Sequence, residues 1–181
     1  MDDRARLVAL LRERSVRTGQ FVLASGKSSD LYVDARVTTL HAEGAAIVAR
    51  LVLARLRPDV VAVGGMTLGA DPIACAASAA SIAALGRPVH AFLIRKEPKG
   101  HGTSQQVEGL ANLGPGAKVC VVEDTTTTGG SLLKAVEVAR AAGLDVVQTL
   151  TVVDREEGAA EAIAAAGVPF EALTTRRDLV P

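Results

Sequence analysis

Apolar residues recur along the chain at two different spacings, which alternate from one segment to the next. Near the amino end, leucine and valine at helical spacing among charged residues predict an amphipathic helix that ends near residues 18–19. Two extended pieces at 21–23 and 31–33 flank a Gly/Ser-rich turn, which predicts a hairpin. Further helices are predicted at 41–56, 72–85, 132–142 and 157–166, and strands at 60–65, 89–94, 118–122, 146–153 and 170–174.

This alternation of strands and helices predicts an α/β fold with a central, mainly parallel sheet flanked by helices on both faces. Ligands in such sheets bind outside the carboxyl ends of the strands, so polar residues there are site candidates. The first central strand ends at Gly64-Gly65, a pair that we expect to permit close backbone approach to a ligand. Residues 95–116 form a polar segment that is longer than an ordinary connection, which indicates a functional loop.

Composition narrows the classes of protein that fit. A chain of 181 residues suits a single domain over 1–181, and its 20 Lys plus Arg balance 20 Asp plus Glu. No overall field favours nucleic acid or a membrane surface, so we expect neither partner. The charged amino end does not resemble a signal peptide or a membrane span, which indicates a cytoplasmic protein. Cys75 and Cys120 lie outside any CxxC pair and are predicted to be buried thiols.

The segment that follows the 118–122 strand has the residues of a phosphate site. Backbone N–H groups and the helix dipole favour an anion where a strand leads into a helix, and glycines permit the φ values of an anion nest. There is no GxxxxGK[ST] or GxGxxG pattern, which argues against nucleotide hydrolysis and dinucleotide binding. The candidate binding residues are Glu123, Asp124, Thr125, Thr126, Thr127, Thr128, Gly129, Gly130 and Ser131.

The two carboxylates that open this segment suit a ribose. Glu123 and Asp124 can accept hydrogen bonds from the 2- and 3-hydroxyl groups of a ribose. A lysine that binds phosphate could not accept these bonds, because its ammonium group only donates. Adjacent strand residues point to opposite faces, so both can reach one ligand only if the strand ends at this pair. The four threonines that follow indicate that it does end there.

An acidic pair followed by Thr, Gly, Gly and Ser on a strand, loop and helix is similar to the phosphoribosyl diphosphate signature of the type I phosphoribosyltransferases. Within that family, the loop RKEPKGHG at 95–102 resembles that of the orotate-using members, as do FVLASGKSSDLYVDAR at 21–36 and VVDREEG at 152–158. These matches run in order over most of the chain. The resemblance implies the type I phosphoribosyltransferase fold, with a small amino-terminal hood over about 1–40 and a flexible lid loop over about 95–116.

The resemblance also implies an activity: transfer of 5-phosphoribosyl from phosphoribosyl diphosphate to orotate, giving orotidine 5-phosphate and diphosphate in UMP synthesis. Such a transfer passes through a cationic sugar and releases diphosphate, so the site needs Mg²⁺ and cations at the leaving group. Arg95, Lys96, Lys99 and His101 supply basic charge for the donor, and Lys99 and His101 are the expected catalytic residues. Mg²⁺ is expected to arrive mainly with the substrate, without a metal site on the protein.

The base is expected to contact a second segment. Arg155 follows the predicted strand at 146–153, and its planar guanidinium suits bidentate pairing with a carboxylate, which orotate carries and uracil lacks. The resemblance assigns Thr127 and Arg155 to orotate, and it implies a homodimer in which the lid of one subunit reaches the site of the other.

Two alternatives stay open at this stage. Transfer to a purine base would make Arg155 incidental to the reaction. A non-catalytic regulator could sense phosphoribosyl diphosphate and bind nucleic acid through another surface, although the neutral net charge argues against it. The chain also departs from the pattern of many orotate-using members, which carry Lys at the position of Ala24 and Tyr-Lys at Leu68-Gly69. The contacts of those side chains are not transferred to this chain.

Overall fold

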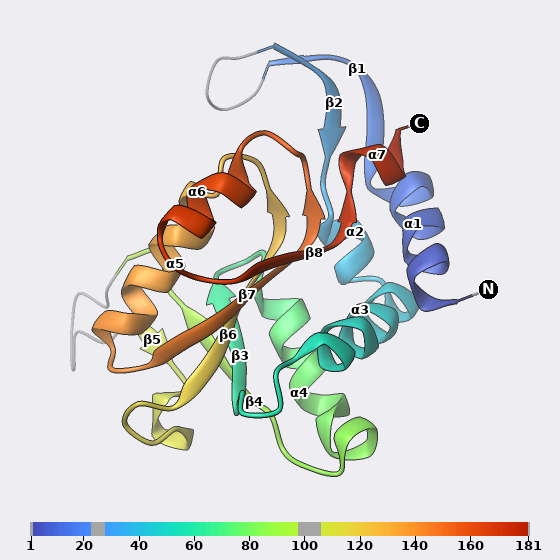
Figure 1. Cartoon of the computed structure of the whole chain (residues 1–181). Helices are drawn as coiled ribbons and strands as arrows, with labels where there is room; N and C mark the ends of the chain where they lie inside the picture. The colour runs from blue at the N-terminus through green and yellow to red at the C-terminus, as the bar shows by residue number, and fades with distance from the viewer. Residues whose placement is uncertain (1, 23–27, 98–105, 181) are drawn as a thin grey trace.

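The computed structural model describes residues 2–22, 28–97 and 106–180. Its centre is a six-stranded sheet with the strand order β5-β4-β3-β6-β7-β8 (Figure 1). Every neighbouring pair is parallel except β4 and β5, which are antiparallel. The predicted mainly parallel sheet is therefore confirmed. The strands are β3 (Ala62–Met66), β4 (His90–Ile94), β5 (Val107–Glu108), β6 (Lys118–Thr126), β7 (Asp145–Asp154) and β8 (Phe170–Thr175).

Helices cover both faces of this sheet, as predicted. One apolar layer packs under α1, α3 and α4, and a second packs under α5 and α6 (Figure 1). Alternate residues of β6 pack into the two layers: Val122 packs under α1, α3 and α4, and Val121 packs under α5 and α6. No helix in the described ranges is both long enough and apolar enough to span a bilayer. The helices are α1 (Asp3–Arg14), α2 (Arg36–Thr39), α3 (Ala42–Arg55), α4 (Asp71–Leu85), the 3₁₀ turn η1 (Leu110–Asn112), α5 (Gly130–Ala141), α6 (Ala159–Ala165) and α7 (Arg176–Leu179).

The amino end differs from the prediction at one boundary. Helix α1 ends at Arg14 rather than near residues 18–19, because β1 (Val16–Val22) begins two residues later and pairs antiparallel with β2 (Ser28–Val33). The β-branched residues of β1 suit this pairing better than a last helical turn. The predicted hairpin is confirmed, with longer strands than expected, and it stands at one end of the central sheet (Figure 1).

The glycine pair of β3 packs strands together instead of ending one. Gly64 and Gly65 lie inside β3, which continues to Met66. A Cβ on Gly64 would overlap the carbonyl oxygen of Phe92 on β4, and a Cβ on Gly65 would overlap that of Val122 on β6. The pair therefore allows close contact between neighbouring elements, which differs from the expected approach to a ligand.

The two cysteines have different environments. Cys120 is buried in β6, as predicted, whereas Cys75 is exposed on α4. Helix α4 packs against the sheet through Ile73, Ala74, Ala77 and Ser81, and Cys75 lies outside that buried set. The prediction of a buried thiol at Cys75 was wrong because the alanine-rich sequence of α4 does not reveal which of its faces is covered.

Candidate active site

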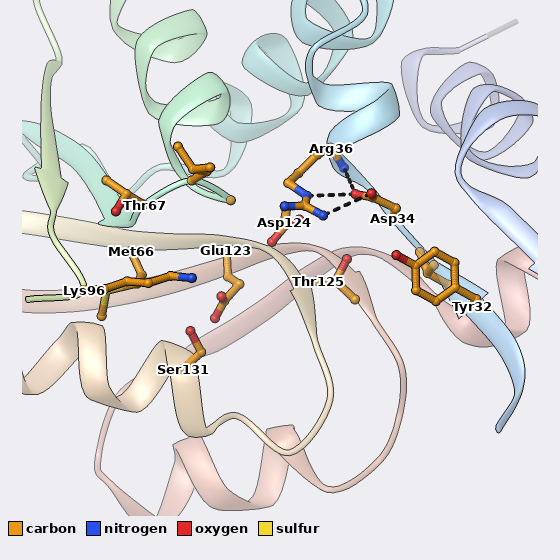
Figure 2. Close-up of a pocket in the computed structure, with 13 residues that line it drawn as sticks. Tyr32, Asp34, Arg36, Met66, Thr67, Lys96, Glu123, Asp124, Thr125 and Ser131 are labelled. Carbon is orange, nitrogen blue, oxygen red and sulfur yellow. Dashed lines mark hydrogen bonds and ion pairs between the residues drawn. The ribbon is translucent and has the colours of Figure 1, made fainter. Parts of the chain in front are cut away.

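The strand order places a pocket between β3 and β6. The chain leaves β3 toward β4 on one side and later returns to β6 on the other side of β3, so the carboxyl ends of β3 and β6 form the topological switch point of the sheet. A pocket of about 230 Å³, here called the β3–β6 pocket, opens at this point (Figure 2). It is lined by Tyr32, Val33, Asp34, Arg36, Met66, Thr67, Leu68, Gly69, Lys96, Glu123, Asp124, Thr125 and Ser131.

The acidic pair reaches this pocket because β6 is longer than its neighbour β3. We predicted that the strand would end at 122, but β6 continues to Thr126 and stays paired with β7 along that length. Its pairing with β3 stops at Val121, so beyond that point one edge of β6 faces the pocket. Glu123 and Asp124 leave opposite faces of this projecting ribbon and both line the pocket. Both carboxylates therefore line one pocket, although the prediction that the strand ends at this pair was wrong.

Glu123 titrates near neutral pH. Burial raises the pKa of Glu123 to about 7, and the nearby charge of Asp124 adds to the rise, while a hydrogen bond with the Ser131 side chain opposes it. In Figure 2 the Lys96 ammonium group points toward this carboxyl group, and Ser131 lies below it at the start of α5. The pocket thus holds a carboxyl group whose charge changes within the physiological range.

Asp124 is balanced by charges from the amino-terminal part of the chain. Burial raises the pKa of Asp124, the positive charge of Arg36 lowers it, and Asp34 raises it further. Arg36 in turn pairs with Asp34 through two hydrogen bonds, from Nε at 2.9 Å and from NH2 at 3.1 Å (Figure 2). Gly69 lies so close to Asp124 that a Cβ there would overlap the carboxylate. The side chain of Asp124 is therefore confined on two sides.

The loop between β6 and α5 has the conformation expected at one of its two glycines. Gly129 caps the amino end of α5 with φ 84, a left-handed value that favours glycine, whereas Gly130 begins the helix without a positive φ. No side chain caps the helix start in the described residues, so its first N–H groups are available to a ligand. Thr126 is buried and donates to the Thr151 hydroxyl at 2.9 Å.

Arg155 lies at the end of β7, one strand away from the pocket. Its backbone N–H donates to the carbonyl oxygen of Thr126 at 2.9 Å, which ties the ends of β6 and β7 together. Asp154 accepts the N–H of Glu156 at 2.8 Å, and Glu156 has φ 57, so the backbone turns sharply after Arg155. The Arg155 guanidinium is buried and lies 2.8 Å from a carboxylate oxygen of Glu157.

The structure brings together part of the predicted site. Lys96, Glu123, Asp124, Thr125 and Ser131 line the β3–β6 pocket. The other predicted residues in the described part of the chain lie outside that lining, and Arg95 among them pairs with Glu108 at 2.7 Å. The predicted catalytic residues Lys99 and His101 fall outside the described residues. The residues outside the lining are Arg95, Thr126, Thr127, Thr128, Gly129, Gly130 and Arg155.

Two groups of lining residues were missed at the level of sequence. Tyr32 lies near the end of β2, Asp34 follows that strand and Arg36 begins α2, while residues 66–69 run from the last residue of β3 into the turn that follows it. The alternation Tyr-x-Asp at the end of β2 was the available signal for Tyr32 and Asp34, since alternate residues of an extended segment share a face, and Arg36 had no such signal because it begins α2. The second group has no charged side chain and offered no chemical signal.

Comparison with known proteins identifies the family. The family described as "Phosphoribosyl transferase domain" matches residues 40–170. An orotate phosphoribosyltransferase of Sorangium cellulosum (strain So ce56) is 50% identical over 181 residues, which cover 99% of this chain and 94% of that protein. The chain belongs to the orotate phosphoribosyltransferase family. Orotate phosphoribosyltransferases act in pyrimidine biosynthesis, so the predicted enzyme class is confirmed over a purine-base transferase and a non-catalytic regulator.

Solved structures support the same family. The Mycobacterium tuberculosis H37Rv orotate phosphoribosyltransferase in complex with Fe(III) dicitrate has a TM-score of 0.83 and 44% identity, covering 99% of this chain and 100% of that chain. The same bacterium's enzyme in complex with 5-phospho-alpha-D-ribosyl 1-diphosphate has a TM-score of 0.78 and 41% identity, covering 98% and 99%. The predicted type I phosphoribosyltransferase fold is therefore confirmed.

Proposed function

We propose that the β3–β6 pocket is where this orotate phosphoribosyltransferase binds phosphoribosyl diphosphate and transfers its phosphoribosyl group. The observation that carries the proposal is the convergence of Glu123 and Asp124, from opposite faces of β6, on a pocket that also receives Lys96. A ribose needs hydrogen-bond acceptors for its hydroxyl groups, and a diphosphate needs cations. The pocket has both kinds of group in its lining.

The proposed placement of the donor follows from this chemistry. Glu123 and Asp124 accept the hydroxyl groups of the ribose, and the start of α5 receives the 5-phosphate through its backbone N–H groups. The Ser131 hydroxyl and the threonine hydroxyls of residues 125–128 add donors to the same phosphate. In the reaction, a bond forms between orotate N1 and ribose C1 while the bond from C1 to the diphosphate oxygen breaks.

The departing diphosphate requires compensation of its negative charge. Lys96 and Arg95 lie at the start of the lid, and Lys99 and His101 follow in the part of the lid outside the described residues. We assign leaving-group stabilisation or proton transfer to Lys99 and His101. Since removal of one donor to a developing charge costs on the order of 3 kcal/mol of barrier, Lys99→Ala should slow the transfer about a hundredfold.

Magnesium enters this scheme as part of the substrate. No group of three or more His, Cys, Asp or Glu side chains in the described ranges could hold a metal ion. A diphosphate supplies several oxygens, which are the ligands that Mg²⁺ prefers. We therefore propose that the donor binds as its Mg²⁺ complex.

Orotate is assigned to the neighbouring strand end. The Arg155 guanidinium lies where β7 ends, and its backbone N–H contacts Thr126, the residue before Thr127. A planar guanidinium can hold the orotate carboxylate in bidentate fashion, which would distinguish orotate from uracil. This placement is supported by the adjacency of the β6 and β7 ends, and it requires the bound base to extend beyond the pocket lining toward β7.

We further propose a single domain over 1–181, with the hood over about 1–40 and the lid over about 95–116. The antiparallel pair β1 and β2 supports the hood, because Tyr32 and Asp34 at its end line the same pocket as β6. The two free cysteines suit a reducing compartment, which supports the proposed cytoplasmic location.

A homodimer is the proposed assembly. Apolar side chains lie exposed on α2, on α4 and in the turn before α4, around a groove of about 520 Å³ that we call the α2–α4 groove. Exposed apolar surface of this kind marks a protein interface. The exposed apolar side chains that line the groove are Val37, Leu40 and Leu68, together with the exposed Cys75, and Ile82 and Leu85 are exposed farther along α4.

The shared lid can be tested by mixing two inactive variants. Lys99→Ala and Asp124→Asn subunits are each expected to be nearly inactive alone. If the lid of one subunit serves the site of its partner, random exchange of subunits should restore roughly a quarter of wild-type activity, because half of the dimers have one intact site of two. Absence of any recovery after exchange would contradict the shared lid, and a monomer by sedimentation would contradict the dimer.

The reaction itself is tested by offering four bases. Wild-type protein with Mg²⁺ and phosphoribosyl diphosphate should consume orotate and release diphosphate, and it should leave uracil, hypoxanthine and adenine largely unchanged. Consumption of another base in preference to orotate would contradict the assignment. Asp124→Asn serves as the control for the pocket, since it removes one acceptor for the ribose and should weaken binding of the donor.

A further inference from the structure

Arg36 occupies a position in the pocket that the proposed reaction does not use. Its side chain comes from the first residue of α2, far from the phosphate segment in sequence, and lines the pocket with Asp34 and Asp124. We propose that Arg36 is a positioning residue for the donor: its guanidinium lies between the carboxylates of Asp34 and Asp124 and holds Asp124 ready for a ribose hydroxyl. This inference rests on the proposed binding of phosphoribosyl diphosphate at Glu123 and Asp124.

The geometry of the Asp34–Arg36 pair fixes the guanidinium. Nε and NH2 of Arg36 donate to the two different oxygens of Asp34, and the backbone N–H of Arg36 donates to one of them at 3.2 Å. A guanidinium group that donates to both oxygens of one carboxylate has little rotational freedom. In Figure 2 this guanidinium lies between Asp34 and Asp124, and Arg36 is part of the pocket lining. Arg36 is thus a cation of fixed position.

The charges around Arg36 explain why such a cation is needed there. Three carboxyl groups, Asp34, Glu123 and Asp124, line one small pocket, and the only cations in its described lining are Arg36 and Lys96. Lys96 points toward Glu123, which leaves Arg36 to balance Asp34 and Asp124 (Figure 2). Without Arg36, those two acids would repel each other in a partly buried site, and Asp124 would lose charge or turn away.

Confinement of Asp124 adds to the argument. Gly69 approaches the Asp124 carboxylate so closely that there is no room for a Cβ on that side. Asp124 therefore cannot relieve repulsion by moving toward Gly69. Hydrogen bonds from the backbone N–H groups of Thr125 and Asp124 and the positive charge of Arg36 stabilise its carboxylate, and Arg36 is the side chain that offsets the charge of Asp34. A surface ion pair of ordinary kind would have no such neighbour and would contribute little to any function.

The chain offers a matched control for this comparison. Arg50 pairs with Asp3 through Nε at 2.7 Å and NH2 at 2.8 Å, which is the same bidentate geometry. The Arg50 side chain is 51% exposed and that of Arg36 is 46% exposed, so the two pairs have similar solvation. Arg50 lies on α3, outside the pocket lining.

The experiment measures binding of the donor and of orotate to wild-type protein and four variants by titration calorimetry, with melting temperatures recorded for each. Arg36→Gln should weaken binding of Mg²⁺–phosphoribosyl diphosphate about tenfold, a middle value for coupled charges, and should change orotate binding less than about twofold. Arg36→Lys keeps the charge and should stay within about threefold of wild type. Asp34→Asn with Arg36→Gln removes the repelling neighbour and should recover most of the loss. Arg50→Gln should leave both affinities unchanged.

Three results would overturn the inference. The first is an affinity of Arg36→Gln for the donor within about twofold of that of wild type, and the second is a double variant that binds the donor as weakly as Arg36→Gln. The third is an equal loss of affinity for donor and orotate in Arg36→Gln, together with a lower melting temperature. The last result would indicate a structural role only. Failure of the proposed function looks different, because wild-type protein would then fail to bind the donor or Asp124→Asn would bind it normally.

Discussion

Glu157 and Arg155 form an ion pair of 2.8 Å at the end of β7, and the arginine side chain is only 5% exposed. A buried guanidinium is costly unless a carboxylate and hydrogen bonds accompany it. Glu157 therefore contributes to holding Arg155 in the fold, next to the end of β6 where the donor is proposed to bind. Any carboxylate that binds Arg155 joins or replaces Glu157 at this guanidinium.

The first prediction concerns the base. Arg155→Ala should weaken orotate binding by about 2 kcal/mol, or about thirtyfold, because a charge-assisted pair with the substrate is lost, and it should spare the phosphoribosyl donor. Calorimetric titration with each ligand checks this. Arg177→Ala is the control, since Arg177 pairs with Glu156 in the same region but is 87% exposed. Equal losses for donor and orotate would remove the assigned role.

The second prediction is a pH dependence of stability. Burial raises the pKa of Glu123 from its ordinary value of 4.5 to about 7, so between these values the folded chain holds a proton that the unfolded chain releases. The stability that this provides is complete below pH 4.5 and is lost as pH rises toward 7. The free energy of unfolding of wild type relative to Glu123→Gln should therefore fall with pH across this window, by at most about 3 kcal/mol.

Binding of the donor should follow the opposite trend. The ionised Glu123 carboxylate is the better acceptor for a ribose hydroxyl, so the affinity for phosphoribosyl diphosphate should rise as pH passes through about 7. Urea unfolding and donor titrations at pH 5, 6, 7 and 8 give both curves. Glu123→Gln should flatten each of them, and a variant that retains the wild-type profile in both would exclude Glu123 as the titrating group.

The third prediction uses the confinement of Asp124. Gly69→Ala would push a Cβ into the Asp124 carboxylate, so we expect at least tenfold weaker binding of the donor with little effect on orotate. Gly114→Ala is the matched control, because no heavy atom lies within 4 Å of its Cβ position. If Gly69→Ala binds the donor as wild type does, the carboxylate has more freedom than the structure indicates.

The fourth prediction concerns stability. A Cβ at Gly64 would meet the backbone oxygen and the ring of Phe92, and neither can move without displacing β4. Gly64→Ala should therefore lower the free energy of unfolding by about 3 kcal/mol or more, as overpacking of a rigid core does. Denaturant unfolding measures it, with Gly114→Ala again as the reference. A loss below about 1 kcal/mol would mean that β3 and β4 can separate slightly.

The sequence predicted the parts of the molecule whose signals are local. Apolar spacing located each main strand and helix, and the order of charged and small residues located Glu123, Asp124 and Ser131. It failed where a distant partner decides the outcome. Pairing with β2 ended α1 early, and pairing with β7 carried β6 past the acidic pair.

The same reason explains the missed pocket residues. Asp34 and Arg36 line one pocket with Asp124 only because the chain folds the end of β2 and the start of α2 beside the end of β6. The alternation of Tyr32 and Asp34 indicates a shared face, but it does not indicate which distant residues lie opposite that face. The exposure of Cys75 is a similar case, because the uniform apolar character of α4 hides which face packs.

Asp34, Arg36 and Leu68 line both the β3–β6 pocket and the α2–α4 groove, so one wall separates the two. A subunit seated in the groove would press on the side chains that face the donor. If association of two subunits changes the affinity for the donor by some factor, thermodynamic reciprocity requires that bound donor changes the affinity of the subunits for each other by the same factor. Dilution of the enzyme and the concentration of the donor would then both shift the same equilibrium between separate and associated subunits.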